Sequence, residues 1–525
     1  MKKALLFAGF CAIAIAVSAQ NPFAYGISAD GVNVSYTLNA DASKVFINLM
    51  NGDVLVKAFE APEGSQTKGS HEVVVDIDDL QPGNYSFQIT VQGLPNQEIK
   101  EIFTDTGSGP PPQFWSLYGL AVDNNPNSPH FGRVLVTETQ ANMGATYFAG
   151  KNVGAGIYEY DPQGNPVESA EGLYGYNPLK FTNFKYVGGA ASTAFHAKKV
   201  RITKDGRIFV GVLNTIDNPI YEVNPDDLNA WSPVFDGTIN TEGGEGYVYT
   251  ADQEFLAAPS AAFDVWGEGD DLKFANLGCQ YGQNYAFGSY TCYEYNLGKN
   301  KTISAAPASE DRVTPYTYQY SISSQSVSIA YDADGKGIWY VQYRSTPTEA
   351  QPSIKHATIN EDGDWEEDYS DITTIARGGG VAWNKDYTML AMPKNSNVLG
   401  VYTVAKENGA PVLTEKYSIN TAIRGFNDIA FDYANNIYVC DNGKEYMQLI
   451  QLPDSPNGTV VTTPAPMGQE IIITPTAVND INAKTVSSVQ YVNINGQVSN
   501  EPFTGINVVV TNYSDGSKTV AKIVK

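Results

Sequence analysis

The sequence predicts an all-β protein that contains a repeated unit of short antiparallel strands. Its 525 residues include 33 Tyr, 22 Phe and 48 Gly, and short runs of branched and aromatic residues alternate with clusters of Asn, Asp, Gly and Pro. Branched and aromatic side chains favour strands, whereas the clustered residues favour tight turns. Long stretches with helical periodicity are hard to find. With 42% hydrophobic residues the chain can form packed cores, and its length suggests about three structural units.

The charge balance excludes one broad class of partner. The chain has 57 acidic and 33 basic residues, which gives a net charge of −24. Binding to nucleic-acid phosphates needs clustered Lys and Arg, so we expect no nucleic-acid partner. The same negative surplus disfavours binding to an anionic membrane surface.

The first residues are typical of a secretory signal peptide. Two lysines follow Met1, and the apolar run 4–17 leads to the small pair Ser18-Ala19. Cleavage after Ala19 fits the small-residue pattern of such sites. The apolar run is shorter than the about 20 residues that a spanning helix needs. We therefore expect residues 1–19 to be removed and the mature protein to be secreted or held at the cell surface, without a transmembrane span.

Residues 20–105 have the pattern of a separate β-sandwich. Apolar and polar residues alternate along several short segments, and turns are marked by Asn51-Gly52 and Pro82-Gly83. This order of strands and turns resembles the FlgD-type immunoglobulin-like module. The Gly/Pro-rich segment 106–113 is predicted to be a stiff linker, because proline does not donate to a sheet ladder.

One unit occurs six times in the middle of the chain, at intervals of about 50 to 80 residues. Each copy has an apolar strand, a tight turn with Asp, Asn or Gly, a second strand, a variable loop and a third strand rich in Tyr, Val and Ile. The predicted first strands lie at 120–123, 200–202, 263–265, 328–331, 381–383 and 428–432, and the third at 156–160, 219–223, 292–295, 353–358, 399–403 and 447–452. Units of this size bury their faces only by packing on each other, so the sequence predicts a six-bladed β-propeller over 114–455.

The last copies, most clearly at 425–439, resemble blades of NHL-repeat and gluconolactonase/SMP-30-like propellers. Lactonase-like members hold a divalent cation with an early Glu and later Asn and Asp residues. The resemblance makes Asn427 the matching metal ligand, while Asp428 stands where these proteins have Gly. No early Glu occurs in the matching sequence context, which disfavours metal-dependent catalysis.

No residue pattern identifies a catalytic centre, and no catalytic residue is predicted. The chain has 4 His and lacks a nucleophile elbow, a phosphate loop and a His-Glu-x-x-His helix. The ligand-binding candidates are aromatic residues of long connections and one histidine before a first strand, namely Tyr281, Tyr285, Tyr290, Tyr174, Tyr176 and His196. Tyrosine stacks on sugars and peptides with little loss of entropy, but the same residues would also suit loops that simply fold over the propeller.

Two further features concern metals and disulfides. No cofactor is predicted, although the acidic turns at 332–335 and 361–364 offer oxygen ligands that would suit Ca²⁺, and hairpin turns use the same residues for backbone reasons. Cys279 and Cys292 flank a Tyr/Gly-rich stretch, and a disulfide between them is one alternative in an oxidising compartment. Cys440 lies in an apolar strand, where we expect a buried thiol.

The C-terminal region 487–525 follows a predicted linker at 456–486 and contains short strands separated by turns. An Asn-Gly turn, a Gly-Ile pair, an apolar strand and a Lys-containing last strand occur in the order that resembles the C-terminal sorting domain of type IX secretion cargo in Bacteroidetes. Asn507 stands where that family usually has Tyr. The resemblance implies secretion machinery as a partner, and the alternative is a small β-domain that merely closes the chain.

Three functions are consistent with these features. The first is a secreted or cell-surface propeller that binds a glycan or a protein without catalysis. The second is a metal-dependent, lactonase-like hydrolase or lyase. The third is a structural or adhesion component of the cell surface, for which the immunoglobulin-like module is a precedent. The absence of catalytic motifs favours the first hypothesis.

Overall fold

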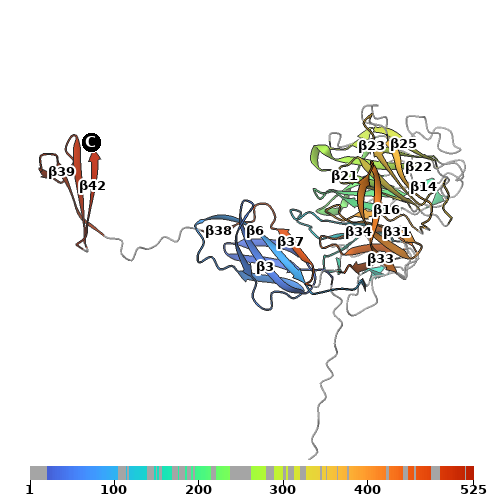
Figure 1. The fold of residues 1–525 in the computed structure, drawn as a ribbon, viewed down its shortest axis with the longest axis horizontal. Coiled ribbons are helices and arrows are strands. Elements are labelled where there is room, and N and C mark those ends of the chain that lie inside the picture. Colours follow the sequence, from blue (N-terminus) through green and yellow to red (C-terminus); the bar gives the residue numbers. More distant parts are fainter. Residues whose placement is uncertain are drawn as a thin grey trace, which may run out of the picture. The chain divides into compact units, whose positions relative to one another are not determined.

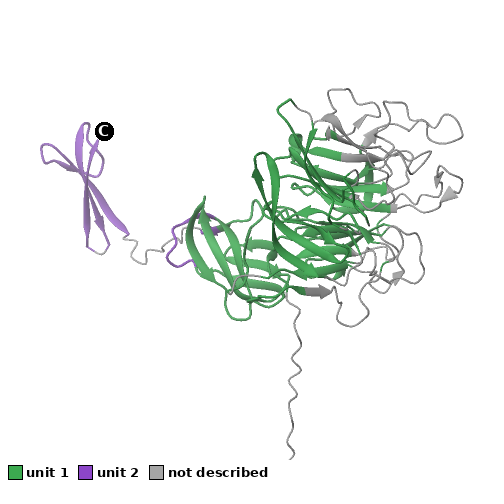
Figure 2. Ribbon diagram, turned by 45° about the vertical axis from the view of Figure 1, so that its right-hand side comes forward, with its two compact units in different colours: residues 1–76, 86–471 green, residues 77–85, 472–525 purple. Residues whose placement is uncertain are grey.

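The computed structural model confirms the all-β prediction. It describes residues 20–103, 114, 117–138, 147–148, 151–152, 156–167, 176, 184–185, 191–192, 196–213, 220–236, 262–279, 289–298, 303–304, 313–319, 327–342, 346–349, 352–362, 365–374, 376, 378–420, 425–441, 447–453, 457–473, 485–514 and 516–525. Apart from a 3-10 helix at Gly269–Asp271, the elements named in these ranges are strands. No helix in the described ranges is long and apolar enough to span a membrane. The chain divides into two compact units, 1–76 with 86–471 and 77–85 with 472–525 (Figure 2).

The larger unit contains a β-propeller made of four-stranded antiparallel sheets, six of which fall in the described residues (Figure 1). The first three are β8 (Leu117–Val122), β9 (Val134–Glu138), β12 (Gly156–Tyr160) and β13 (Pro166–Val167); β16 (His196–Ile202), β17 (Ile208–Leu213), β18 (Ile220–Asn224) and β19 (Asp227–Pro233); and β21 (Ala262–Trp266), β22 (Lys273–Cys279), β23 (Ser289–Asn296) and β25 (Val313–Gln319). Each sheet corresponds to one sequence repeat, and within each the strands follow chain order.

Two of the other three sheets also follow chain order, and the last one takes its fourth strand from before the first repeat. They are β26 (Val327–Tyr331), β27 (Gly337–Gln342), β28 (Ile354–Ile359) and β29 (Trp365–Asp371); β30 (Ala382–Trp383), β31 (Leu390–Asn395), β32 (Val398–Glu407) and β33 (Ala410–Asn420); and β34 (Phe426–Phe431), β35 (Ile437–Asp441), β36 (Met447–Gln451) and β7 (Lys100–Phe103). Short strand pairs accompany them: β10 (Tyr147–Phe148) with β11 (Lys151–Asn152), β14 (Phe184–Lys185) with β15 (Ala191–Ser192), and β20 (Phe235–Asp236) with β24 (Ile303–Ser304).

Apolar cores between neighbouring sheets close the ring. Leu120, Val136 and Tyr158 of the first sheet pack with Tyr438 and Leu449 of the last. Similar cores join the first sheet to the second, the fourth to the fifth and the fifth to the sixth. The strand β21 contacts both β16 and β26, which joins the third sheet to its two neighbours. The first strand of each repeat is thus the innermost, as radial packing of repeated sheets requires.

The last sheet takes its fourth strand from the N-terminal side of the propeller. Strand β7 pairs antiparallel with β36, with Phe103 opposite Gln448 and Lys100 opposite Gln451. The sequence analysis assigned residues 100–103 to the sandwich at 20–105. Alternation within four residues does not show which sheet a strand joins, because either partner would supply the same hydrogen bonds.

The N-terminal region forms two sheets. The first contains β1 (Ala24–Asp30), β2 (Asn33–Leu38) and β5 (Gly69–Val74), and the second contains β37 (Val460–Pro464), β6 (Gly83–Gly93), β3 (Ala42–Asn51) and β4 (Val54–Glu60), with β38 (Ile471–Ile473) also paired to β6. The predicted Asn51-Gly52 turn joins β3 to β4, and Gly52 has a φ of 59°, which suits glycine. Strand β37 comes from the segment that the sequence analysis treated as a linker.

The residues after the predicted cleavage site lie between the N-terminal sheets and the propeller, within the larger unit. Phe23 packs with Phe131, Tyr433 and Val461 in one buried aromatic cluster. Next to it, the backbone N–H of Asn21 donates to the Asn436 side chain at 2.8 Å, and the Asn436 amide donates back to the Asn21 carbonyl at 3.0 Å. We call this region, made of residues 20–23, 39, 131, 432–436 and 461, the junction.

The smaller unit contains a four-stranded antiparallel sheet in its C-terminal part. Its strands are β40 (Val498–Ser499), β39 (Val486–Asn493), β41 (Ile506–Tyr513) and β42 (Lys518–Val524), in that order. Asn507 is fully buried there, where its side chain accepts from the Phe503 N–H at 2.8 Å and donates to the Phe503 and Gly505 carbonyls. The residue therefore fixes the turn that leads into β41.

Candidate functional site

Three adjacent innermost strands are distorted at the same level of the propeller. Strands β34, β8 and β16 belong to the last, first and second sheets, and each has a register shift near its beginning, between Phe426 and Asp428, Leu117 and Gly119, and Ala197 and Lys199, respectively. A bulge inserts one residue and redirects the neighbouring side chains. As a result the consecutive residues Lys198 and Lys199 are both buried, each with 1% of its surface exposed.

Gly119 allows strands β8 and β16 to approach each other closely. A Cβ atom at this position would lie 2.5 Å from the Lys198 carbonyl oxygen and 2.7 Å from Thr137 Oγ1. The Gly119 N–H donates to Thr137 Oγ1 at 2.7 Å, and that hydroxyl donates to the Lys198 carbonyl at 2.8 Å. Thr137 therefore links β8 to the bulge of β16 and holds Lys198 and Lys199 in place.

Asp428 is the acceptor at the centre of the propeller and is fully buried. Its Oδ2 accepts from the Leu120 N–H at 3.0 Å and from Arg201 Nη1 at 2.8 Å. Its Oδ1 accepts from Arg201 Nη2 at 3.2 Å and lies 3.3 Å from Lys199 Nζ. Both carboxylate oxygens are therefore used by the protein's own donors.

The Lys199 ammonium reaches oxygens of two other sheets. Its Nζ donates to Ser328 Oγ of β26 and to the Asn427 carbonyl of β34, both at 2.6 Å, in addition to its contact with Asp428. An ammonium group has three N–H donors, and these three oxygens give each of them an acceptor.

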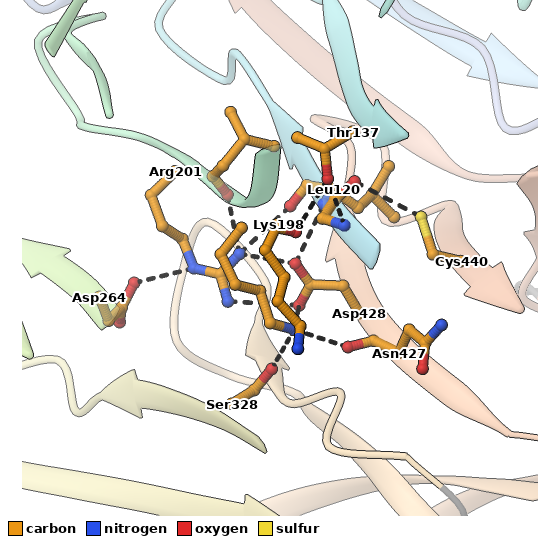
Figure 3. Close-up of polar contacts among 12 residues, drawn as sticks. Leu120, Thr137, Lys198, Arg201, Asp264, Ser328, Asn427, Asp428 and Cys440 are labelled. Atoms are coloured by element: carbon orange, nitrogen blue, oxygen red, sulfur yellow. Dashed lines mark hydrogen bonds and ion pairs between the residues drawn. The ribbon is translucent and has the colours of Figure 1, made fainter. Parts of the chain in front are cut away.

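Arg201 lies between two carboxylates (Figure 3). Besides Asp428, its guanidinium contacts Asp264 of the third sheet, with Nε 3.3 Å from Asp264 Oδ1. The other Asp264 oxygen accepts from the Tyr331 N–H at 2.8 Å. Lys199, Arg201, Asp264 and Asp428, which we call the central cluster, therefore hold two positive and two negative groups from three sheets.

Burial dominates the acid–base behaviour of the central cluster. It lowers the pKa of Lys199 to about 8, although the charge of Asp428 opposes this shift. It raises the pKa of Asp264 to about 6, against the opposing effect of Arg201. Burial also disfavours the charged form of Arg201, but Asp428 and Asp264 outweigh it and the pKa of Arg201 is raised. Each charge is therefore maintained by its partners.

The central cluster does not fit the divalent cation that the lactonase resemblance implies. The Asn427 side-chain amide donates to the Leu117 carbonyl at 2.7 Å, and the Asp428 carboxylate already contacts two cations. A metal ion would have to displace the Lys199 ammonium and bind beside the guanidinium of Arg201. Within the described part of the chain, no group of three or more His, Cys, Asp or Glu side chains is placed to hold a metal.

The predicted ligand-binding residues are only partly covered by the described residues. Tyr176 is half-buried and forms an isolated bridge with Ile157, and burial raises its pKa. His196 begins β16 opposite Leu213, and Tyr290 lies in β23, but their side chains lie outside the description. Tyr174, Tyr281 and Tyr285 lie outside the described residues.

The cysteine residues occupy neighbouring strands of the third sheet and one strand of the last. In the backbone register, Cys279 is opposite Tyr290 and Cys292 is opposite Leu277, so the two cysteines are diagonal neighbours whose side chains lie outside the description. Cys440 is a buried thiol whose Sγ donates to the Gly119 carbonyl oxygen at 3.5 Å.

The acidic turn at 332–335 has its own internal partners. Asp332 accepts from Trp339 Nε1 at 3.0 Å and contacts His356 Nε2 at 3.1 Å, while His356 Nδ1 contacts Asp368 at 2.5 Å. Burial alone would lower the pKa of His356, but the hydrogen bonds to the two carboxylates outweigh it and raise that pKa. Of the second acidic turn, residues 363 and 364 lie outside the described residues.

The sequence analysis did not identify Lys199, Arg201, Asp264 or the His356 pairing. A signal for the first two exists: 198–202 has three basic residues in a first strand, where the other repeats have mainly apolar residues. Basic residues in an innermost strand need buried acidic partners. Their partners come from sheets far along the chain, so the pairing itself is visible only in the structure.

Comparisons with known proteins found matches among solved structures alone. No protein-family description matches the sequence, and no curated protein matches it. A similar solved structure is a luciferin-regenerating enzyme, with 10% identity, coverage of 72% of this chain and 98% of that chain, and a TM-score of 0.34. The WD40 β-propeller domain of Doa1 has 8% identity, coverage of 68% of this chain and 99% of that chain, and a TM-score of 0.34. A Bacteroides fragilis protein provisionally named a 6-phosphogluconolactonase has 12% identity, coverage of 72% of this chain and 96% of that chain, and a TM-score of 0.32. Identities and TM-scores this low do not transfer an activity.

Proposed function

We propose that this chain is a secreted or cell-surface propeller that binds a glycan or a protein and performs no catalysis. The observation that carries this proposal is the state of Asp428. Its carboxylate is neutralised by Lys199 and Arg201, so the position where a lactonase-like propeller would hold its metal is taken by the chain's own cations. Because Lys199 and Arg201 occupy that position and the sequence has no catalytic motif, ligand binding is the function that we propose.

The proposed binding surface is the end of the propeller where the innermost strands begin. Antiparallel pairing places the start of each first strand beside the end of the second strand, as for Leu117 with Glu138, Val327 with Gln342 and Phe426 with Asp441. The longest connections of the chain start or finish at this end. Insertions gathered on one face of a rigid scaffold are the usual position of binding loops.

Tyrosines at this end supply the proposed contacts. Tyr176 is close to the start of β12 through its bridge to Ile157, and Tyr290 is next to the start of β23. We propose that they act with Tyr174, Tyr281, Tyr285 and His196, which the sequence places in or beside the same connections. Aromatic faces bind both sugar rings and peptides, which is why the ligand class includes glycans and proteins.

A binding screen with matched variants tests this function. Purified 20–525 is applied to a glycan array and a peptide array, and the metal content and lactone turnover of the same sample are measured. We expect an array ligand, no stoichiometric metal and no turnover. Tyr176→Ala should weaken binding at least about tenfold, whereas Tyr387→Ala, in the turn between β30 and β31 at the opposite end, should not. Stoichiometric metal with lactone turnover would instead establish the hydrolase.

The flanking regions extend the proposal to location. We propose that residues 1–19 direct export, that the N-terminal sandwich is an immunoglobulin-like module, and that 487–525 engages the secretion machinery as a sorting domain. The exposed apolar residues of the C-terminal sheet, among them Val498, Val520 and Val524, are consistent with a protein partner. Deletion of 491–525 should leave the protein inside the cell envelope, and unchanged surface exposure of the truncated protein would refute the sorting role.

A further inference from the structure

We propose that the Lys199 ammonium is the resident cation of the propeller, filling an oxygen-lined site that two other sheets build for a small cation with hydrogen-bond donors. This inference concerns what holds the centre of the ring, and it does not depend on the ligand or on the proposed function. It assigns to Lys199 the structural task that a bound ion performs in other proteins.

The geometry of the oxygens supports a cation site. Ser328 Oγ, the Asn427 carbonyl oxygen and Asp428 Oδ1 all lie within 3.3 Å of Lys199 Nζ. A hydroxyl, a carbonyl and a carboxylate are the oxygen types that surround bound cations in proteins. The ammonium comes from the second sheet, whereas the oxygens come from the fourth and the sixth, so one positive charge joins sheets that are not neighbours in the ring.

The charges of the central cluster support a single positive charge at this point. Arg201 supplies one positive charge, and Asp264 and Asp428 supply two negative charges. With the positive charge of Lys199, the net charge of the central cluster is zero. Without it, one negative charge would stay uncompensated at a site from which water is excluded, which is strongly destabilising. A monovalent cation restores the balance, whereas a divalent ion would leave a net positive charge.

The backbone near this site is built around the ammonium. The bulge between Ala197 and Lys199 places an extra residue in β16, and the bulge between Phe426 and Asp428 does the same in β34. The Asn427 carbonyl that receives the ammonium belongs to the second bulge. Both distortions remove ladder pairing, and the contact between Lys199 and Asn427 supplies a reason for them.

Chemical rescue of a truncated lysine tests the proposal. Lys199→Ala removes three carbons and the ammonium, which n-propylammonium supplies as a free molecule. The melting temperature of full-length Lys199→Ala should fall by roughly 5–10 °C, and millimolar n-propylammonium should recover at least half of that shift. Equal concentrations of tetramethylammonium, which has no N–H donor, should recover none. The exposed Lys204→Ala variant is the matched control and should respond to neither amine.

Three results would overturn the proposal. The first is a Lys199→Ala protein as stable as the wild type, and the second is a destabilised variant that both amines restore equally. The third is stoichiometric metal in the wild-type protein, or stabilisation of the wild type by Ca²⁺, since a metal would then be the resident cation.

If Lys199→Ala does not fold, the double variant Lys199→Met/Asp428→Asn replaces it. That variant should fold and be less destabilised than Asp428→Asn alone, and the reverse order would also refute the proposal.

Discussion

The central cluster and the junction are both buried polar regions, and they are built from different chemistry. The centre joins sheets with formal charges: Lys199 and Arg201 meet Asp264 and Asp428. The junction joins the N-terminal sheets to the propeller mainly with neutral amides, such as Asn21 with Asn436, beside an aromatic cluster. Buried charges tolerate the loss of a partner poorly, whereas an unpaired amide costs less. Loss of one partner in the central cluster should therefore cost more free energy of unfolding than loss of one partner in the junction.

The largest expected effect is at Asp428. Asp428→Ala leaves Lys199 and Arg201 buried without their shared carboxylate, so we expect a loss of about 3–5 kcal/mol in the free energy of unfolding. Asp428→Asn keeps the shape and an acceptor oxygen and should lose less. Urea denaturation followed by fluorescence measures both values. A loss below about 1 kcal/mol for Asp428→Ala would show that the charges at the centre are not coupled and would remove the contrast with the junction.

A smaller effect is expected at Asn436 of the junction. Its side chain accepts from the Asn21 N–H and donates to the Asn21 carbonyl and to Asp432, so Asn436→Ala should cost about 1–3 kcal/mol. The matched control is Asn165→Ala. Asn165 donates to Asp161 in a turn of the same design, but it is exposed. Thermal unfolding should show a larger loss of stability for Asn436→Ala than for Asn165→Ala. Equal losses would mean that Asn436 acts only within its turn.

The fold could be predicted from the sequence because its units repeat. The tight turns of 203–206 and 332–335 have their glycines at positive φ, and the turns begin with a backbone hydrogen bond from Thr203 or Asp332 to the second strand. Such local patterns need no knowledge of distant residues. The pairing of β7 with β36 could not be predicted for the opposite reason, because it joins residues about 350 positions apart and the four residues of β7 match either sheet.

The candidate site was much harder to predict. Asn427 and Asp428 were selected through a resemblance, which indicated their position in the propeller but not their partners. Lys199 pairs with Asp428 across 229 residues, and Arg201 reaches both Asp264 and Asp428. His356 lies in β28, the third strand of its sheet, and is buried between Asp332 and Asp368. Ion pairs have no sequence period, so only the three-dimensional arrangement reveals them.

The pH dependence of stability sharpens the comparison, because the junction contains one acidic group. Asp432 is buried beside Asn436, and burial raises its pKa from 3.8 to about 7. The folded state therefore holds the Asp432 proton between about pH 4 and 7, where the unfolded state has released it. The stability that this group contributes is fully present below pH 4 and is lost as the pH rises through 7.

The variant Asp432→Asn should remove that contribution. Its stability relative to the wild type should rise between pH 4 and 7, as measured by urea denaturation at a series of pH values. Taking the difference cancels the contributions of other groups, such as Asp264 and His356. Asp161→Asn is the matched control, because Asp161 accepts the same three hydrogen bonds but is only partly buried. A flat difference for Asp432→Asn would show that Asp432 is ionised throughout.

The smallest expected effect is at an ion pair on the surface, which shows how much an exposed pair contributes to the free energy of unfolding. Lys204 Nζ lies 3.3 Å from Glu268, and the two side chains are 79% and 54% exposed. Water and salt screen such a pair, so Lys204→Ala should change the free energy of unfolding by no more than about 0.5 kcal/mol. The pair joins the second and third sheets, as Arg201 and Asp264 do at the centre. A cost at Lys204 close to that of Asp428→Ala would mean that contact between sheets matters and burial of the charges does not.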